Sequence, residues 1–257
     1  MKLVDLASRA ANLAGNYLRE VERPANPAAW SRKGRGDFVT DVDRRAEEMI
    51  RETLLAGEPG STVIGEELSP DVETSGLVWI VDPLDGTTNF LHGIRDHAVS
   101  IAAAVDGQLV AGVVLEVPAN RLYRAWLGGG AWLEERRLAV SSITNPADAL
   151  IGTGFPFTDL SRLEEYLGQL RRVVTTTAGV RRPGSAALDL RSVAEGAFEG
   201  FWELRLSAWD IAAGMLLIRE AGGKVTDLAG RDLGIEHGTV VAGNPAIHQW
   251  LLEQLKA

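Results

Sequence analysis

Closely spaced acidic residues form the part of the sequence best suited to chemistry. In the stretch WIVDPLDGTTNF an apolar run ends at Asp82, and a second carboxylate follows at Asp85. Pro83 predicts that the strand stops there, and Gly86 and Thr87 predict a sharp turn into a helix. Carboxylates at the end of a strand can hold hard divalent cations, and free backbone N–H groups at a helix start can receive a phosphate.

Further carboxylates occur at similar positions elsewhere in the chain. Glu66 and Glu67 follow a short apolar run, Asp210 begins the apolar helix WDIAAG, and Asp43 lies at a strand-to-helix junction. Taken singly, each has an ordinary explanation: a solvated pair, or an acid favoured by the helix dipole. Taken together, they indicate a carboxylate cluster that requires cations.

The elements that must position these residues follow from the apolar pattern. An amphipathic helix is predicted over 2–22, a loop over 24–36, and a second helix after Thr40. Strands are predicted at 61–64, 77–81, 99–105, 109–117 and 122–126, with a hairpin turn at Asp106–Gly107. Gly128–Gly130 is predicted to be a plain turn, because neither a P-loop nor a dinucleotide motif is completed there.

The rhythm of the chain changes after Ser141. Strands are predicted at 149–153, 198–203, 224–227 and 239–242, and helices at 160–173, 184–196, 208–221 and 245–255. The expected fold class is an α+β / α/β layered sandwich with two packed lobes. Residues 1–140 form an α+β lobe with most of the acidic cluster, and 141–257 form an α/β lobe with Asp210.

Composition excludes several classes of function. The 257 residues contain no cysteine, which excludes disulfides, cysteine-zinc sites and thiol catalysis. The net charge of −9 argues against broad binding to nucleic acid or to anionic membranes. No apolar run is long enough for a signal peptide or a membrane span. We therefore expect a cytoplasmic protein with neither a nucleic-acid nor a membrane partner.

The motifs GDFVTDVD, GEE, WIVDPLDGTTNF, GSAALDL and WDIAAG, in this order, resemble those of the inositol monophosphatase family. The resemblance runs from about residue 33 to residue 244 and places the chain in a magnesium-dependent, lithium-sensitive sugar-phosphatase superfamily. It implies a sugar-phosphatase fold with alternating α and β layers, two or three Mg²⁺ ions per site, and a homodimer. The implied activity is hydrolysis of a small sugar or polyol phosphate.

The resemblance also implies roles for individual residues. Five residues would ligate metal: Glu66, Asp82, Leu84 through its carbonyl, Asp85 and Asp210. Glu66 and Thr87 would orient the attacking water, with Asp43 supporting the Thr87 hydroxyl. Eight residues would contact the substrate: Asp85, Gly86, Thr87, Gly184, Ser185, Ala186, Glu203 and Asp210. Lys33 matches the basic residue of the family's mobile loop.

The identity of the alcohol stays open at this stage. Hydrolysis of inositol 1-phosphate is the leading interpretation. A fructose-1,6-bisphosphatase, a 3′(2′),5′-bisphosphate nucleotidase and a histidinol-phosphatase are alternatives in the same superfamily. A regulatory protein that keeps the fold and docks on transcription machinery is an alternative of another class.

Overall fold

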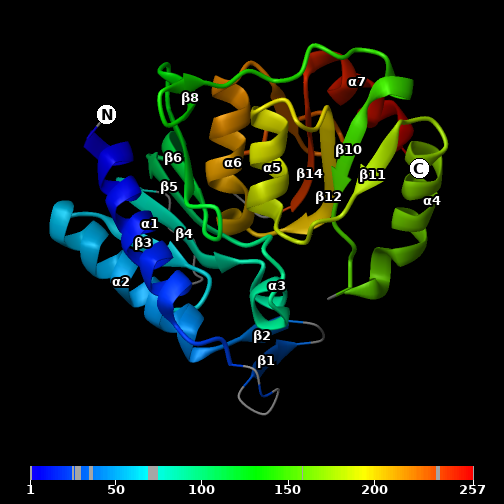
Figure 1. Ribbon diagram of the computed structural model, residues 1–257. Helices are drawn as coiled ribbons and strands as arrows, with labels where there is room; N and C mark the ends of the chain where they lie inside the picture. Colours follow the sequence, from blue (N-terminus) through cyan, green and yellow to red (C-terminus); the bar gives the residue numbers. More distant parts are fainter. Residues whose placement is uncertain are drawn as a thin grey trace.

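Two mixed β-sheets, each covered by helices, make up the structure (Figure 1). The computed structural model describes residues 2–24, 26, 30–34, 37–68, 75–157, 159–235 and 238–256. The first sheet has the spatial order β3-β4-β5-β6-β7-β8-β9, with β3 parallel to β4 and the later neighbours antiparallel. Its strands are β3 (Thr62–Gly65), β4 (Leu77–Asp85), β5 (Ala98–Val105), β6 (Gln108–Glu116), β7 (Arg121–Trp126), β8 (Gly130–Leu133) and β9 (Arg136–Arg137).

The second sheet comes from the C-terminal part of the chain and has the order β11-β10-β12-β14-β13. β10 is parallel to both of its neighbours, whereas β14 is antiparallel to β12 and β13. Its strands are β10 (Leu150–Thr153), β11 (Gly179–Arg181), β12 (Gly200–Leu206), β13 (Lys224–Thr226) and β14 (Gly238–Gly243). Separately, β1 (Ser31–Gly34) and β2 (Asp37–Val39) pair with each other.

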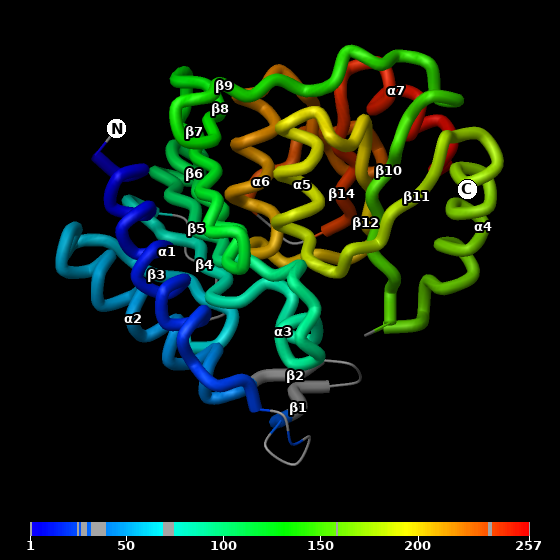
Figure 2. The backbone as a smooth tube through the Cα atoms, in the orientation of Figure 1, coloured from blue at the N-terminus to red at the C-terminus, as the bar shows by residue number. Residues whose placement is uncertain are grey.

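Helices and sheets alternate in layers. α1 (Lys2–Glu20) and α2 (Asp41–Gly57) lie side by side on one face of the first sheet, as Figure 2 shows. α5 (Ala186–Ala194) and α6 (Ala208–Glu220) fill the space between the two sheets (Figure 1). α4 (Leu163–Val174) and α7 (Pro245–Gln254) cover the outer face of the second sheet. The short helices among the described residues are α3 (Thr87–His92), η2 (Pro146–Asp148) and η3 (Leu160–Arg162).

β4 shows why this sequence requires a layered arrangement. Successive side chains of a strand point to opposite faces of the sheet. Trp79 and Val81 accordingly pack with α1 and α2, while Val78 and Ile80 pack against the layer of α5 and α6. A strand that is apolar at every position therefore needs helices on both faces of its sheet. The carboxyl end of β4 accordingly lies between two helix layers.

The prediction that Pro83 ends this strand is wrong. β4 continues to Asp85, but its register against β5 shifts by one residue, from Asp82 opposite Ser100 to Asp85 opposite Ala98. Pro83 lies within this β-bulge, where the missing proline N–H removes no ladder hydrogen bond. Because β3 ends at Gly65, opposite Val81, the bulge with Asp82 and Asp85 lies beyond the end of β3.

The other differences from the sequence-based predictions concern short elements. The interval 24–36 contains β1, which pairs with β2 and whose residues, SRKG, leave no apolar pattern in the sequence. The helix predicted from residue 160 begins as the 3-10 turn η3, and β8, β9 and β11 were not predicted. The hairpin at Asp106–Gly107 is confirmed, with left-handed φ values of 49° and 80°. The predicted turn at Gly128–Gly130 is confirmed between β7 and β8, with Gly130 already the first residue of β8.

None of the described helices is long and apolar enough to cross a membrane. The division into lobes at residue 140 stays a prediction.

Candidate active site

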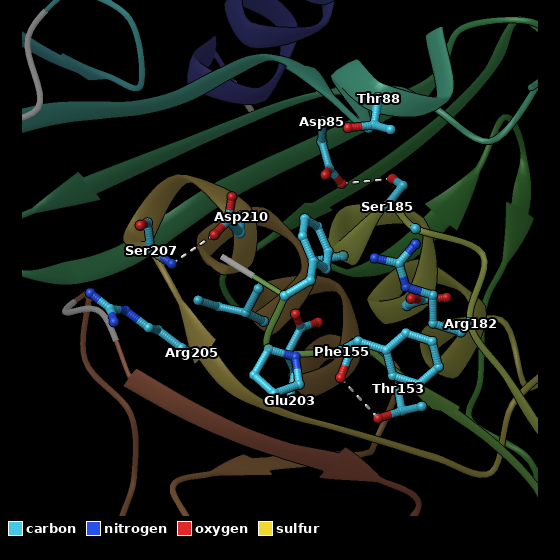
Figure 3. A pocket seen from close by; sticks show the side chains of 18 of the residues that line it. Asp85, Thr88, Thr153, Phe155, Arg182, Ser185, Glu203, Arg205, Ser207 and Asp210 are labelled. Carbon is cyan, nitrogen blue, oxygen red and sulfur yellow. Dashed lines mark hydrogen bonds between the residues drawn. The ribbon is translucent and has the colours of Figure 1, made fainter. Parts of the chain in front are cut away.

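A cavity of about 510 Å³ lies where the ends of several elements meet. Its walls include the carboxyl end of β4, the first turn of α3, and the amino ends of α5 and α6. The far wall comes from the ends of β10 and β12. Figure 3 shows Asp85, Asp210 and Glu203 around this cavity, each carried by a different element. Nine residues that were predicted to form the site line it: Glu66, Asp85, Gly86, Thr87, Gly184, Ser185, Ala186, Glu203 and Asp210.

Asp82 and Leu84 lie just behind this wall, both about 1% exposed. Inside the bulge, the Leu84 N–H donates to Asp82 Oδ1 at 3.0 Å. Burial raises the pKa of Asp82 well above its ordinary value, and the charges of Glu66, Asp85 and Asp210 raise that pKa further. The bulge therefore places one buried carboxylate within the field of three others.

The amino end of α5 clamps Asp85. One carboxylate oxygen, Oδ2, accepts a hydrogen bond from the Ser185 hydroxyl at 2.6 Å (Figure 3). The same oxygen also accepts from the Ala187 N–H at 2.7 Å. Burial raises the pKa of Asp85, and these hydrogen bonds oppose the rise. Ser185 is the N-cap of α5, so one helix start fixes the direction of an acid that comes from the other sheet.

Asp210 is fixed by the start of its own helix. It is the N3 residue of a capping box in α6, and its Oδ2 accepts from the Ser207 N–H at 2.6 Å (Figure 3). Burial and the charges of Glu66 and Asp85 raise the pKa of Asp210 well above its ordinary value. Asp210 thus has both roles that the sequence allows. It caps the start of α6, and it lines the cavity.

Thr87 stands between two acceptors. Its hydroxyl can donate to Asp43 Oδ1 or to the Leu84 carbonyl, each at 3.0 Å. Asp43 is 1% exposed and also accepts from the Thr40 N–H at 2.8 Å and from the Thr40 hydroxyl at 2.5 Å. Burial raises the pKa of Asp43, and the hydrogen bonds oppose that rise. The structure therefore brings Asp43 and Thr87 together, although they are 44 residues apart.

Gly86 starts α3 in the left-handed region, with φ 91°. A side chain there would bring Cβ to 2.8 Å from the Asp96 carbonyl, so only glycine fits without a shift. The turn can therefore bring backbone N–H groups close to a ligand.

The wall opposite the carboxylates combines acids, aromatic rings and two arginines, Arg182 and Arg205. Burial raises the pKa of Glu203 to about 8, while Arg182 lowers it and Asp85 raises it. The Arg182 guanidinium carbon lies 5.4 Å from the ring centre of Phe155 and 5.1 Å from that of Phe157. Asp189, one turn beyond Ser185, is 2% exposed, and its Oδ1 has no hydrogen-bond partner among the described residues.

Several residues of this region were not assigned from the sequence. Phe155 and Phe157 left no local signal, and Asp189 lies inside the GSAALDL motif without having been singled out. Glu47 approaches from α2, 20 residues before the backbone that it contacts. The predicted role of Lys33 concerns a side chain outside the part of the chain that the structure describes.

The donor set fits magnesium in its chemistry. Carboxylates and a carbonyl are the hard oxygen ligands that Mg²⁺ prefers, and a cation would relieve the repulsion that raises the pKa values of Asp82 and Asp210. In the described residues, no three acidic or histidine side chains are already grouped closely enough to hold an ion. Asp85 and Asp210 each direct one oxygen to a protein donor. Ion binding would therefore draw the acids closer together, with the second oxygen of Asp85 and of Asp210 left for the ion while Oδ2 keeps its protein donor.

Comparison with known proteins gives a consistent result. The inositol monophosphatase family model matches residues 2–257. An inositol-1-monophosphatase of Mesorhizobium japonicum is 46% identical, over 99% of this chain and 96% of that protein. A protein of Pseudomonas aeruginosa named Nus factor SuhB is 43% identical, over 99% and 96%.

Solved structures agree with the expected fold. The extragenic suppressor protein SuhB of Bartonella henselae has a TM-score of 0.90 at 40% identity, covering 100% of this chain and 99% of that one. An IMPase of Thermotoga maritima has a TM-score of 0.90 at 29% identity, covering 99% and 97%. The layered sugar-phosphatase fold expected from the motifs is confirmed. The chain belongs to the inositol monophosphatase family.

Proposed function

We propose that this protein is a phosphomonoesterase that hydrolyses a small polyol phosphate, with inositol 1-phosphate as the leading substrate. The observation that carries the proposal is the convergence of Glu66, Asp85 and Asp210 on one cavity, with the buried Asp82 directly behind its wall. Their shared charge needs a counter-ion, and family members typically depend on Mg²⁺.

The cations would be held by Glu66, Asp82, the Leu84 carbonyl, Asp85 and Asp210. When bound, Mg²⁺ activates a water and neutralises charge on the phosphoryl and leaving oxygens. We propose two or three ions per site, as the resemblance implies. The Ser185 and Ala187 hydrogen bonds to Asp85 support this role, because they fix the orientation of one ligand.

Other residues act on the water and on the phosphate. Asp43 accepts a charge-assisted hydrogen bond from the Thr87 hydroxyl, so the lone pairs of the Thr87 oxygen stay available to a water O–H. Glu66 shares the orientation of that water. The N–H groups of Gly86 and Thr87 would hold phosphoryl oxygens at the start of α3, which is the role proposed for this turn.

The alcohol would occupy the far wall of the cavity. Gly184, Ser185 and Ala186 line it, and Glu203 provides a polar contact. At neutral pH the raised pKa of Glu203 favours the protonated acid, which can donate a hydrogen bond to a hydroxyl. In this wall Glu203 and Asp189 suit hydroxyl groups, and a second phosphate would have to bind through Arg182 and Arg205, which also line the cavity.

A direct comparison of esters tests this assignment. Phosphate release would be measured with Mg²⁺ on inositol 1-phosphate, fructose 1,6-bisphosphate, adenosine 3′,5′-bisphosphate and histidinol phosphate. We expect the highest kcat/KM on inositol 1-phosphate. A higher value on either bisphosphate would overturn the reading of the far wall. A higher value on histidinol phosphate would indicate that the acids attract its amine.

A role in transcription is a second candidate, because relatives at 39–43% identity are named Nus factor SuhB. Binding of the full chain to purified bacterial RNA polymerase, followed by interferometry, tests it. The Asp85→Asn variant separates the two roles, since it should lose hydrolysis and keep such binding. The expectation of no nucleic-acid partner stays a prediction.

Two further properties are proposed from the resemblance. We expect a cytoplasmic homodimer, and sedimentation at micromolar concentration would reveal a particle of twice the 27.6 kDa chain mass. A particle of 27.6 kDa would contradict the dimer.

A further inference from the structure

Helix α2 reaches the candidate site at two points, one helical turn apart. Asp43 and Glu47 are four residues apart and therefore project from the same face of the helix, which packs against β3 and β4 (Figure 1). Their exposed fractions are 1% and 0%, whereas the next acid, Glu48, is exposed. Asp43 holds Thr87, and Glu47 is the second buried acid of this face.

The Glu47 carboxylate binds the turn that carries Glu66. Its Oε2 accepts from the Glu67 N–H at 2.8 Å, and its Oε1 accepts from the Leu68 N–H at 3.2 Å. The Glu66 N–H donates to the Val81 carbonyl of β4 at 3.2 Å. Three successive backbone groups of this turn thus have fixed partners, so the turn is held by α2 on one side and by β4 on the other.

Gly65 provides the space for this contact. A Cβ atom built on Gly65 would collide with the Glu47 carboxylate. Gly65 lies in β3 with a backbone that imposes no requirement for glycine, since its φ is not positive. A glycine inside a strand often marks the close approach of another group. The missing side chain and the buried acid therefore fit each other directly before Glu66.

We propose that Glu47 is a positioning residue for Glu66: by fixing the turn 66–68, its carboxylate sets the affinity of the site for the cation that Glu66 helps to hold. The inference rests on the proposed function, in which Glu66 is a cation ligand. α2 would then brace the site twice, through Glu47 toward Glu66 and through Asp43 toward Thr87.

The Glu47→Gln variant of the full chain tests the proposal. Glutamine keeps the size of the side chain, but its NH₂ group must face one of the two backbone N–H donors. Calorimetric titration with Mg²⁺ alone, without substrate, should give a Kd about 10–100-fold weaker than that of the wild type. The matched control is Glu48→Gln, whose exposed acid pairs with Arg45 at 3.0 Å, and it should leave the Mg²⁺ affinity unchanged.

The outcomes separate positioning from simple stabilisation. A Glu47→Gln variant that melts earlier but binds Mg²⁺ as tightly as the wild type overturns the proposal and leaves the proposed function intact. A wild-type chain that binds no Mg²⁺ overturns both.

If Glu47→Gln does not fold, Gly65→Ala provides a second test, because it displaces the carboxylate and keeps every acid of the site. Weaker Mg²⁺ binding by folded Gly65→Ala supports the proposal, and unchanged binding contradicts it.

Discussion

Replacement of Asp43 by asparagine should separate the orientation of the Thr87 hydroxyl from the fold of the site. The buried Thr40 N–H needs an acceptor, so the asparagine oxygen should take the place of Oδ2 and its NH₂ group should face Thr87. The Thr87 proton then turns to its other acceptor, the Leu84 carbonyl at 3.0 Å. The Thr87 hydroxyl thereby loses its charge-assisted hydrogen bond to Asp43. It donates instead to the Leu84 carbonyl, which is a proposed metal ligand.

The size of the effect follows from the bond that is lost. A hydrogen bond to a charged group contributes about 1.5–3 kcal/mol. If that amount is lost only in the transition state, kcat falls by about 10–150-fold. KM for the ester should stay near the wild-type value, because the Gly86 and Thr87 N–H groups are unaffected. The substitution is nearly isosteric, so the far-UV circular dichroism should not change.

The assay is steady-state phosphate release at saturating Mg²⁺ and neutral pH. Asp41→Asn is the matched control, since Asp41 lies in the same first turn of α2, is exposed and pairs with Arg44 at 3.5 Å. We expect its kcat to equal that of the wild type. A folded Asp43→Asn variant with wild-type kcat would refute the view that Asp43 orients Thr87.

The remaining predictions concern the clamp, the far wall and competing cations. Ser185→Ala removes the 2.6 Å hydrogen bond to Asp85 and should weaken Mg²⁺ binding by about tenfold or more in calorimetry; an unchanged Kd would contradict the clamp. Because burial raises the pKa of Glu203 from 4.5 to about 8, its contribution to stability is complete below pH 4.5 and is lost as pH rises through about 8. In urea unfolding with EDTA, the free energy of unfolding of Glu203→Gln should therefore rise relative to that of the wild type as pH increases from 4.5 to about 8. A difference between the two proteins that stays constant over this pH range would contradict the raised pKa of Glu203. Lithium should inhibit hydrolysis uncompetitively or noncompetitively toward the ester, and Ca²⁺ should reduce the activity that Mg²⁺ supports. Purely competitive inhibition by lithium would argue against the view that lithium binds after chemistry begins.

Local sequence patterns predict the elements that are long and periodic. The apolar stripe of α1 and the fully apolar run of β4 each determine their own structure, because burial on one face or on two leaves a distinct pattern. The motif at the end of β4 also locates Asp85 and Gly86 directly before a helix. The family motifs add Asp210 and Glu66 to the predicted site. In the structure both residues line the same cavity.

Contacts between distant segments could not be predicted in the same way. The bulge at Pro83 depends on the register with β5, which no residue near Pro83 specifies. Glu47 reads as one of several acids on α2, and only the packing of α2 against the turn after β3 distinguishes it from Glu48. The arrangement of Arg182 over Phe155 likewise depends on how two segments of the second sheet meet at the cavity.

The central claim is that the buried carboxylates work through a bound cation to hydrolyse a phosphate ester. Release of inorganic phosphate from inositol 1-phosphate, measured with Mg²⁺, then with EDTA in excess, and again after Mg²⁺ is restored, tests it most directly. We predict turnover with Mg²⁺, its loss in EDTA, recovery on re-addition, and no turnover by Asp85→Asn under any of these conditions. Full activity in excess EDTA would contradict the account, because Asp82, Asp85 and Asp210 would then have no catalytic role.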